Sequence, residues 1–572
     1  MLRFAGARPY CATVTTLVDA VVETLKAEGT DTVFGICGGY FFWLLQAFER
    51  AGIRNLPSRH EGAAAFSAAA YAQASGRIGV VLGQGPGATN TLTGVASAYC
   101  DSTPLLVFAS QAPQESYAAD AHQEATGSNH GVDQLPLFKA VTRATLRPPT
   151  PTSALRSLRR ALAVANAERG PVMLEIAANL FKQEIVWESL EPAQYRADPR
   201  RVDVAGIEEA ARLIARAENP VLVIGNRATH RGLSADIQEL CELGRLPLVT
   251  TDFAKGIIAE DHPLSVGIVG LSGHPGTLAY LESADLVISI GARLDSKTTL
   301  NYRSSLFKNL IQIDEIASDI GRNFPLELGI LGDIPASIRA LRDALRTAQI
   351  RRPASERVEK IRRQHRTYNE PIATEDHGDG LRAPRALHVL RQHLPREALI
   401  CGDSGLNLQY LKRFFPVLSP DSFFCFYGFA AMGSGLPIAI GVQAARPKDV
   451  VVLVIGDGGF LVHAGELQVM AEYGLPIVCV VLNNAGYGQV AKYMDRYIGS
   501  TYGCPIKEID AAKIAEAFGC DGYRARSSSE LAAAVEAAVS KRRPAVIDVK
   551  IVGENLDDLQ LPGVAEFMAA RL

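Results

Sequence analysis

The chain has 572 residues, more than one hydrophobic core usually organises, so a division into three compact domains is expected. Its net charge of −3 comes from 58 basic and 61 acidic residues mixed along the sequence, which excludes the basic surface that nucleic-acid binding requires. The sequence has no run of about 20 consecutive apolar residues, so no membrane span is expected.

The cysteines and the N-terminal residues bear on the cellular compartment. The nine cysteines show no paired spacing, which argues against a disulfide framework and favours a reducing cytoplasm. The first 17 residues contain Arg3 and Arg8 and no acidic residue, a feature of mitochondrial transit peptides. Because the helical pattern of the folded chain begins almost at once, we expect no cleaved leader and a cytoplasmic location.

Apolar, β-branched runs alternate with alanine-rich segments of helix length along the whole chain. The runs cover residues 77–83, 104–110, 171–176, 220–225, 285–291, 449–456, 476–483 and 544–551. Runs that are apolar on both faces are typical of buried parallel strands. The sequence therefore predicts the α/β class, built from doubly wound parallel sheets.

Two segments of different composition separate the apolar blocks. Residues 190–201 are polar, and residues 351–370 are highly charged. Such stretches are typical of domain boundaries. We therefore predict three doubly wound parallel-sheet domains, at residues 1–188, 189–365 and 366–572.

The first domain holds two candidate functional segments. Residues 58–77 place Glu61 at the start of an alanine-rich helix, where a carboxylate is also favourable for purely structural reasons. Gly83, Gly85 and Gly87 follow a predicted strand, but their spacing departs from the GxGxxG pattern of dinucleotide sites. The acidic residue that such a site needs further along is also missing, which disfavours a nicotinamide-dependent oxidoreductase.

The third domain carries the most informative segment, residues 450–490. A predicted strand ends in Gly456-Asp457-Gly458-Gly459, a helix follows, and a second strand ends in Asn483-Asn484. The carboxyl ends of parallel strands share one edge of a sheet, where ligands bind. A carboxylate and a carboxamide at that edge suit Mg²⁺, and the glycines let backbone N–H groups approach a diphosphate. Either motif alone is a common turn; the pair predicts a metal–diphosphate site.

The spacing of these two motifs resembles the signature of thiamine diphosphate-dependent enzymes, in which GDG is followed about two dozen residues later by NN. Nearly the whole chain is similar to acetohydroxyacid (acetolactate) synthases. The resemblance implies a pyrimidine-binding, a central and a diphosphate-binding domain. It also implies that Asp457, the Asn484 side chain and the Gly486 carbonyl hold Mg²⁺. Gly456, Gly458, Gly459 and Tyr487 are the implied cofactor contacts beside them.

Other blocks extend the resemblance to the rest of the cofactor site. The implied cofactor residues are Asn90 and Gln111 in block 83–112, Ser404, Gly405 and Asn407 in GDSGLN (402–407), and Ala430 and Met432 in YGFAAMGSGLP (427–437). Glu61 matches the glutamate that hydrogen-bonds the aminopyrimidine ring and serves in acid–base catalysis. In DAHQEA (120–125), His122 replaces an aromatic residue of the synthases. His122 and Gln123 are catalytic candidates, although a solvated loop histidine remains an alternative.

The positions that would face the substrate depart from the synthases. Tyr40 stands after Gly39 where they carry alanine, and Gln489 and Tyr493 replace a methionine and a tryptophan. We therefore expect an enzyme that decarboxylates a 2-keto acid, with pyruvate the first donor to test, and transfers the acyl-anion equivalent to an acceptor other than that of a housekeeping acetolactate synthase. A 2-keto acid decarboxylase, a C–C lyase on another substrate and a non-catalytic binding module are the alternatives.

The resemblance leaves flavin and subunit number open. Residues 284–299 resemble the strand and loop that contact FAD in the synthases, with Arg293 as the matching arginine. Residues 251–267 resemble flavin-free members instead, so absence of FAD is favoured. Family members divide the cofactor between the first domain of one chain and the third domain of its neighbour. This implies a homodimer or a homotetramer acting on small molecules.

Overall fold

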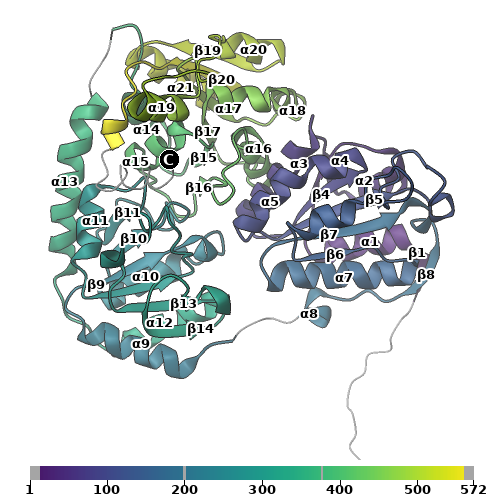
Figure 1. Cartoon of the computed structure of the whole chain (residues 1–572), viewed down its shortest axis with the longest axis horizontal. Coiled ribbons are helices and arrows are strands. Elements are labelled where there is room, and N and C mark those ends of the chain that lie inside the picture. The colour runs from purple at the N-terminus through teal and green to yellow at the C-terminus, as the bar shows by residue number, and fades with distance from the viewer. Residues whose placement is uncertain (1–12, 197–200, 375–377, 560–572) are drawn as a thin grey trace, which may run out of the picture. The chain divides into compact units, whose positions relative to one another are not determined.

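The computed structural model describes residues 13–196, 201–374 and 378–559, and Figure 1 labels their helices and strands. Its contacts separate two compact units, residues 1–198 with 440–446, and residues 199–439 with 447–572. Most of the N-terminal segment considered above as a leader, and Cys11 with it, lies outside the described residues. No described helix is long and apolar enough to cross a bilayer.

Three six-stranded sheets, each with parallel strands throughout, confirm the predicted fold class. Each of the three sheets lies within one of the three predicted residue ranges. The domain limits at residues 188 and 365 themselves stay a prediction.

The first sheet has the strand order β3-β2-β4-β5-β7-β6. Its strands are β2 (Thr32–Gly35), β3 (Arg54–Leu56), β4 (Gly79–Gln84), β5 (Leu105–Gln111), β6 (Ala144–Leu146) and β7 (Pro171–Ala177). The helices are α1 (Leu17–Ala27), α2 (Phe42–Ala51), α3 (Glu61–Ser75), α4 (Pro86–Asn90), α5 (Leu92–Cys100), α6 (Gln134–Lys139), α7 (Pro151–Ala167) and α8 (Pro192–Tyr195). A separate antiparallel pair joins β1 (Thr13–Thr16) and β8 (Glu184–Trp187).

Helix α3 shows how the sequence positions the first candidate residue. His60 caps the helix, its Nδ1 accepting from Gly62 N at 3.0 Å, and Gly76 ends it in the left-handed conformation. The alanine side chains between them are small, so α5 and β4 pack closely against α3 and bury most of it. This capping and packing fix Glu61 as the first helical residue.

The central sheet has the order β11-β10-β9-β12-β13-β14. Its strands are β9 (Pro220–Ile224), β10 (Leu248–Thr250), β11 (Ser265–Ile268), β12 (Leu286–Ile290), β13 (Leu310–Asp314) and β14 (Leu326–Leu331). The helices are α9 (Val204–Arg216), α10 (Ser234–Gly244), α11 (Pro275–Glu282), α12 (Ile334–Thr347) and α13 (Ala354–Thr374). The charged segment 351–370, predicted as a boundary, is largely the long helix α13 (Figure 1).

The third sheet has the order β16-β15-β17-β18-β20-β19. Its strands are β15 (Leu399–Gly402), β16 (Phe423–Phe424), β17 (Val451–Gly456), β18 (Val478–Asn483), β19 (Asp521–Ala525) and β20 (Ala545–Lys550). The helices are α14 (Ala383–His393), α15 (Leu406–Phe414), α16 (Gly435–Ala445), α17 (Asp457–Val462), α18 (Leu467–Glu472), α19 (Gly488–Ile498), α20 (Ala511–Ala517) and α21 (Ser528–Lys541).

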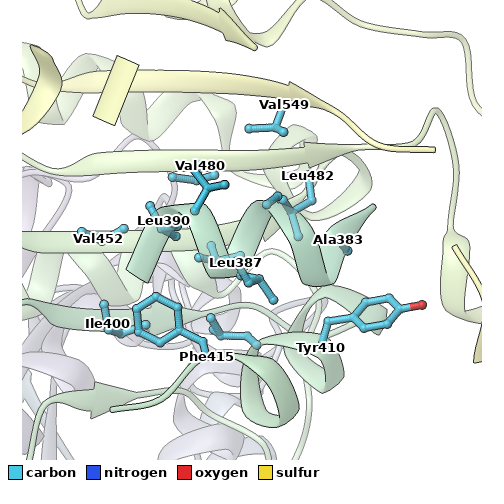
Figure 2. Packing of buried hydrophobic residues seen from close by; sticks show 14 of the residues in the cluster. Ala383, Leu387, Leu390, Ile400, Tyr410, Phe415, Val452, Val480, Leu482 and Val549 are labelled. Carbon is cyan, nitrogen blue, oxygen red and sulfur yellow. The ribbon is translucent and has the colours of Figure 1, made fainter. Parts of the chain in front are cut away.

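The core of the third domain anchors the helix that will carry part of the site. Leu387 and Leu390 of α14 pack against Ile400, Val452 and Val480 of the sheet (Figure 2). Tyr410 and Phe415, on and just after α15, belong to the same cluster. Helix α15 therefore packs into the same core as α14 and the third sheet.

Candidate active site

Strand order places a crevice at one edge of the third sheet. The chain runs from β15 outward to β16 and then returns to β17 on the other side of β15, so the connections diverge between β15 and β17. Ligands of doubly wound sheets bind at the carboxyl ends of the strands at such a point. The loops after β15 and β17 border a cavity of about 420 Å³ there.

Most of the residues predicted for the third domain line this cavity. They are Ser404, Gly405, Asn407, Met432, Gly456, Asp457, Gly458, Gly459, Asn484, Gly486, Tyr487 and Gln489. Ala430 and Tyr493 are partly buried and do not line it. The structure thus brings together segments that are as much as 85 residues apart in the chain.

Asp457 joins the two strand ends. Its Oδ1 accepts from Gly458 N at 2.7 Å and its Oδ2 from Gly486 N at 3.1 Å. Burial raises the pKa of this carboxyl, while the surrounding backbone N–H groups favour its charged form. A cation in the cavity would act in the same direction as the N–H groups and keep Asp457 ionised.

The two asparagines have separate roles. Asn483 Nδ2 donates to Asp548 Oδ1 at 3.0 Å and to the Ile509 carbonyl at 3.0 Å, so this side chain fastens β18 to its neighbours. Asn484 Nδ2 donates to Glu554 Oε2 at 2.5 Å. With its amino group held by Glu554, Asn484 has its Oδ1 available as a metal ligand.

Glu554 is a cavity residue that the sequence did not reveal. Burial raises the pKa of its carboxyl, and the hydrogen bond from Asn484 opposes that rise. Glu554 follows β20 and stands 70 residues from Asn484, with no motif around it. Only the parallel pairing of β18 with β20 shows that the two residues meet.

The cavity suits a diphosphate and a divalent cation. A Cβ atom at Gly459 would lie 2.1 Å from Asp403 Oδ2, and one at Gly458 would lie 2.7 Å from the Tyr487 ring, so only glycine fits at either position. The N–H of Gly458 already donates to Asp457 Oδ1, so an anion at the start of α17 would have to be held by the other N–H groups of this turn. The carboxylate of Asp457 and the oxygen of Asn484 supply hard ligands beside it.

Glu61 lies in the first unit, in contact with the glycine-rich segment. Asn90 Nδ2 donates to Glu61 Oε2 at 3.0 Å. A Cβ atom on Gly87 would lie 2.6 Å from Glu61 Oε1, so only glycine leaves room for the carboxylate there. The block 83–112 and the segment 58–77, which resembled the same family separately, therefore meet at this one carboxyl group.

A second cluster lies at the carboxyl edge of the first sheet. Tyr40 N–H donates to Gln84 Oε1 at 2.7 Å, and the Tyr40 hydroxyl donates to the His122 carbonyl at 2.6 Å. Gln84 Nε2 donates to Gln123 Oε1 at 2.5 Å. Gly39, Tyr40, His122 and Gln123 are thus neighbours, with the His122 ring in an exposed loop. Gln84, which links them, had no signal in the sequence beyond its place at a strand end.

Gln111, unlike the cofactor candidates that line the cavity, is buried and hydrogen-bonded within the protein. It is 1% exposed, and its Oε1 accepts from Ala125 N at 3.0 Å and from Ala112 N at 2.9 Å. Its Nε2 lies 3.5 Å from Glu175 Oε1. The Gln111 oxygen is used by the protein itself, and its bond from Ala125 N fixes the end of the loop that carries His122 and Gln123.

The corresponding edge of the central sheet carries a buried ion-pair cluster. The connections diverge between β9 and β12, and Arg227 follows β9. Its guanidinium reaches past the end of β12 to Asp314, at 2.7 and 2.8 Å, and also donates to Asp319. All three side chains are buried. Because this ion pair occupies the usual nucleotide position, the residues here do not fit FAD; Arg293 lies on the neighbouring loop, partly buried.

Family comparisons agree with this geometry. Residues 15–136 match the family described as "Thiamine pyrophosphate enzyme, N-terminal TPP binding domain", residues 207–341 match its central domain, and residues 403–549 match its C-terminal TPP binding domain. The three matches together cover more than half of the chain.

Several curated proteins resemble the chain over almost its full length. A probable acetolactate synthase large subunit of Methanocaldococcus jannaschii is 30% identical over 93% of this chain and 91% of its own length. Acetolactate synthase isozyme 2 large subunit of Escherichia coli is 28% identical over 95% of this chain and 97% of its own length. The chain belongs to the thiamine diphosphate-dependent enzymes that make or break carbon–carbon bonds, and within them to the acetolactate synthase-like family.

Proposed function

We propose that this enzyme decarboxylates a 2-keto acid and transfers the acyl-anion equivalent to an acceptor other than the one used by a housekeeping acetolactate synthase. The supporting observation is the contact of Tyr40 with the loop of His122 at the edge of the first sheet. Both residues depart from the synthase pattern, and Gln489, a third departure, lines the cofactor cavity. A changed pocket around an intact cofactor site favours a changed acceptor.

In this proposal the cavity residues hold thiamine diphosphate and Mg²⁺. Asp457, the Asn484 side chain and the Gly486 carbonyl would ligate the metal, while the glycines of the same turn contact the diphosphate. Met432, which is 42% exposed, offers an apolar surface for the cofactor rings. When bound, the cofactor supplies the carbon nucleophile that the side chains of a protein lack.

The side chains of the first unit would handle protons and orientation. Asn90 holds one oxygen of Glu61, so this carboxyl can take up and return a proton at a fixed position. Tyr40 and Gln84 hold the backbone of His122 and the side chain of Gln123, the two candidates for contact with the substrate. The Gln111 amide keeps this loop in place.

We further propose a cytoplasmic homodimer or homotetramer. Glu61 belongs to one compact unit and the cofactor cavity to the other, which is compatible with a site shared between neighbouring subunits. Cys37, Cys241, Cys401, Cys479, Cys504 and Cys520 form no disulfide in the described part of the chain, which is compatible with a reducing compartment.

The test is consumption of pyruvate by the purified protein with thiamine diphosphate and Mg²⁺, with all products identified by NMR. The proposal expects slow consumption alone and faster consumption when a panel of aldehydes and keto acids supplies the true acceptor. Rapid formation of acetolactate would contradict the altered acceptor. Acetaldehyde as the sole product would instead identify a decarboxylase.

A further inference from the structure

A second cavity, of about 460 Å³, lies in the unit that contains the cofactor cavity and shares no lining residue with it. Its walls come from β11, the start of α11, helix α13 and the C-terminal end of α15. A volume of this size accommodates a small organic molecule. None of the residues discussed above as catalytic or cofactor-binding belongs to it.

Arg413 is the central charge of this cavity. It is 9% exposed, and its Nη1 donates to the Gly273 carbonyl. Its Nε and Nη2 are buried and have no hydrogen-bond partner among the described residues, and no described carboxylate forms an ion pair with it. These two N–H groups lie on one edge of the guanidinium, which is the edge that binds a carboxylate or phosphate with two parallel hydrogen bonds.

His274 adds a second unused donor. Its Nδ1 accepts from Gly276 N at 2.9 Å, so the proton of the neutral ring lies on Nε2. That Nε2 is buried and has no described partner. Burial, together with the charge of Arg413, lowers the pKa of His274 to about 2, which keeps the ring neutral. A buried N–H without an acceptor is costly, and a bound oxyanion would satisfy it.

The remaining walls favour an organic anion over a bare inorganic ion. Arg362 donates to the carbonyls of Asp261 and His262, at 3.1 and 3.4 Å, and its charge also acts on the carboxylates of Asp261 and Glu359. Phe414 and Leu418 supply apolar surface in the same cavity. The positive charge of the two arginines therefore lies beside a wall that suits hydrocarbon.

Helix α15 connects this cavity to the cofactor site. Gly405 and Asn407, at its N-terminal end, line the cofactor cavity, whereas Lys412 and Arg413, at its C-terminal end, line the second cavity. The helix has 9 residues. At the rise of an α-helix its ends are about 13 Å apart. It is packed into the core of the third domain (Figure 2), so a displacement at one end would be transmitted to the other.

We propose that the second cavity binds a small organic anion whose carboxylate or phosphate group occupies the open edge of Arg413, and that this binding changes cofactor affinity through α15. The ligand is regulatory in this scheme, since it does not enter the cofactor cavity.

The test is calorimetric titration of the protein saturated with thiamine diphosphate and Mg²⁺. The probes are benzoate and phenyl phosphate, which share a ring and differ in the anionic group, and benzamide, which is neutral. We expect at least one anion to bind, with benzamide binding about tenfold more weakly or not at all. Benzoate alone, phenyl phosphate alone or both would each support the site and identify its preferred head group.

The variants localise the binding. Arg413→Met should weaken anion binding by about tenfold or more, since it removes the buried charge. Arg362→Met, at a less buried position, should weaken it less and serves if the first variant does not fold. Arg526→Met, an exposed arginine paired with Asp379, is the control and should bind as wild type. The site is disproved if neither anion binds or if both lining variants bind like wild type.

The coupling between anion binding and cofactor affinity is measured separately. The affinity of the cofactor-free protein for thiamine diphosphate should change by about fivefold when the binding anion is present, and this change should vanish in Arg413→Met. An unchanged cofactor affinity would contradict the coupling. If the protein binds no thiamine diphosphate at all, the proposed function fails, but the anion titration on the protein alone still tests the second cavity.

Discussion

Glu554 gives the proposed metal site its orientation. An asparagine ligates Mg²⁺ through its oxygen, so its amide must not turn over, and Glu554 accepts from the nitrogen of Asn484 at 2.5 Å. Contacts of this kind orient a ligand without touching the metal, and their loss commonly lowers metal affinity by about 10–100-fold. Glu554 is therefore a positioning residue.

Two substitutions separate the hydrogen bond of Glu554 from its charge. Glu554→Gln retains an oxygen that can accept from Asn484, so Mg²⁺ affinity should stay within about twofold of wild type. Glu554→Met removes the acceptor and should weaken Mg²⁺ binding by about tenfold or more. Calorimetric titration with Mg²⁺ in the presence of thiamine diphosphate measures both. Equal losses in the two variants would show that charge, and not orientation, matters.

Glu61 and Asp457 should fail in different ways when substituted. Glu61→Gln should fold and bind the cofactor but lose about 10²–10⁴-fold in turnover, because its carboxyl can no longer exchange a proton. Asp457→Ala should lose cofactor binding, because the proposed metal site would be without its charged ligand. Binding and turnover measured on each variant distinguish the two defects. A fully active Glu61→Gln variant would remove this residue from the mechanism.

Whether a site residue can be predicted depends on whether its signal is local. Asp457 and Asn484 stand in short motifs whose spacing is set by one strand–helix–strand unit, so the sequence alone predicted their proximity. Glu554 acts through a contact with a residue 70 positions away, and Gln84 acts through contacts with residues 44 and 39 positions away. Nothing in the residues beside them marks these contacts, and only the folded sheet shows them.

Among the secondary-structure elements, burial on both faces made strands predictable. All eight predicted runs are strands in the structure, because a buried parallel strand needs apolar residues at every position. The short edge strands β3, β6 and β16 have only two or three residues and no such pattern. Helix α13 was missed for another reason: Val358 and Ile361 are buried, while most of its other positions are polar or charged.

The contact between α11 and α13 predicts how stability depends on pH. The rings of His274 and His365 lie 3.8 Å apart between centroids, and burial lowers their pKa values from 6.5 to about 2 and about 3. Below pH 6.5 the two histidines bind protons in the unfolded chain but stay neutral in the folded chain. The free energy of unfolding therefore falls as the pH falls. The loss between pH 7.5 and pH 5 should be about 2 kcal/mol for each histidine.

Denaturant unfolding at the two pH values checks this expectation. His274→Asn keeps an acceptor for Gly276 N at the helix start. Because one of the two histidines is gone, the fall in the free energy of unfolding between the two pH values should be about half of that in wild type. His130→Asn, in an exposed loop of the first unit, should leave the sensitivity unchanged. If the free energy of unfolding falls as much in His274→Asn as in wild type, His274 is not a source of the acid sensitivity.

At the scale of the whole molecule, the proposed sharing of each site between neighbouring subunits predicts complementation. If neighbouring subunits share each site, Glu61→Gln and Asp457→Ala chains mixed as a dimer form one intact and one doubly defective site. Random pairing of equal amounts should then restore about a quarter of wild-type activity, although each variant alone is inactive. Dissociation, mixing and reassembly, followed by a turnover assay, make the comparison. No recovery in a reassembled mixture would place both residues of each site on one chain.

The ion pairs of Arg227 restrict how this protein can evolve. Removing Asp314 or Asp319 would leave a buried guanidinium short of negative charge, at a cost of about 3–5 kcal/mol, and the whole fold is stabilised by only about 5–15 kcal/mol. Replacing Arg227 first would instead leave two buried carboxylates facing each other. A descendant that acquired a nucleotide at this position of its central domain would have to change all three residues nearly together, so single substitutions give no easy route to such a site.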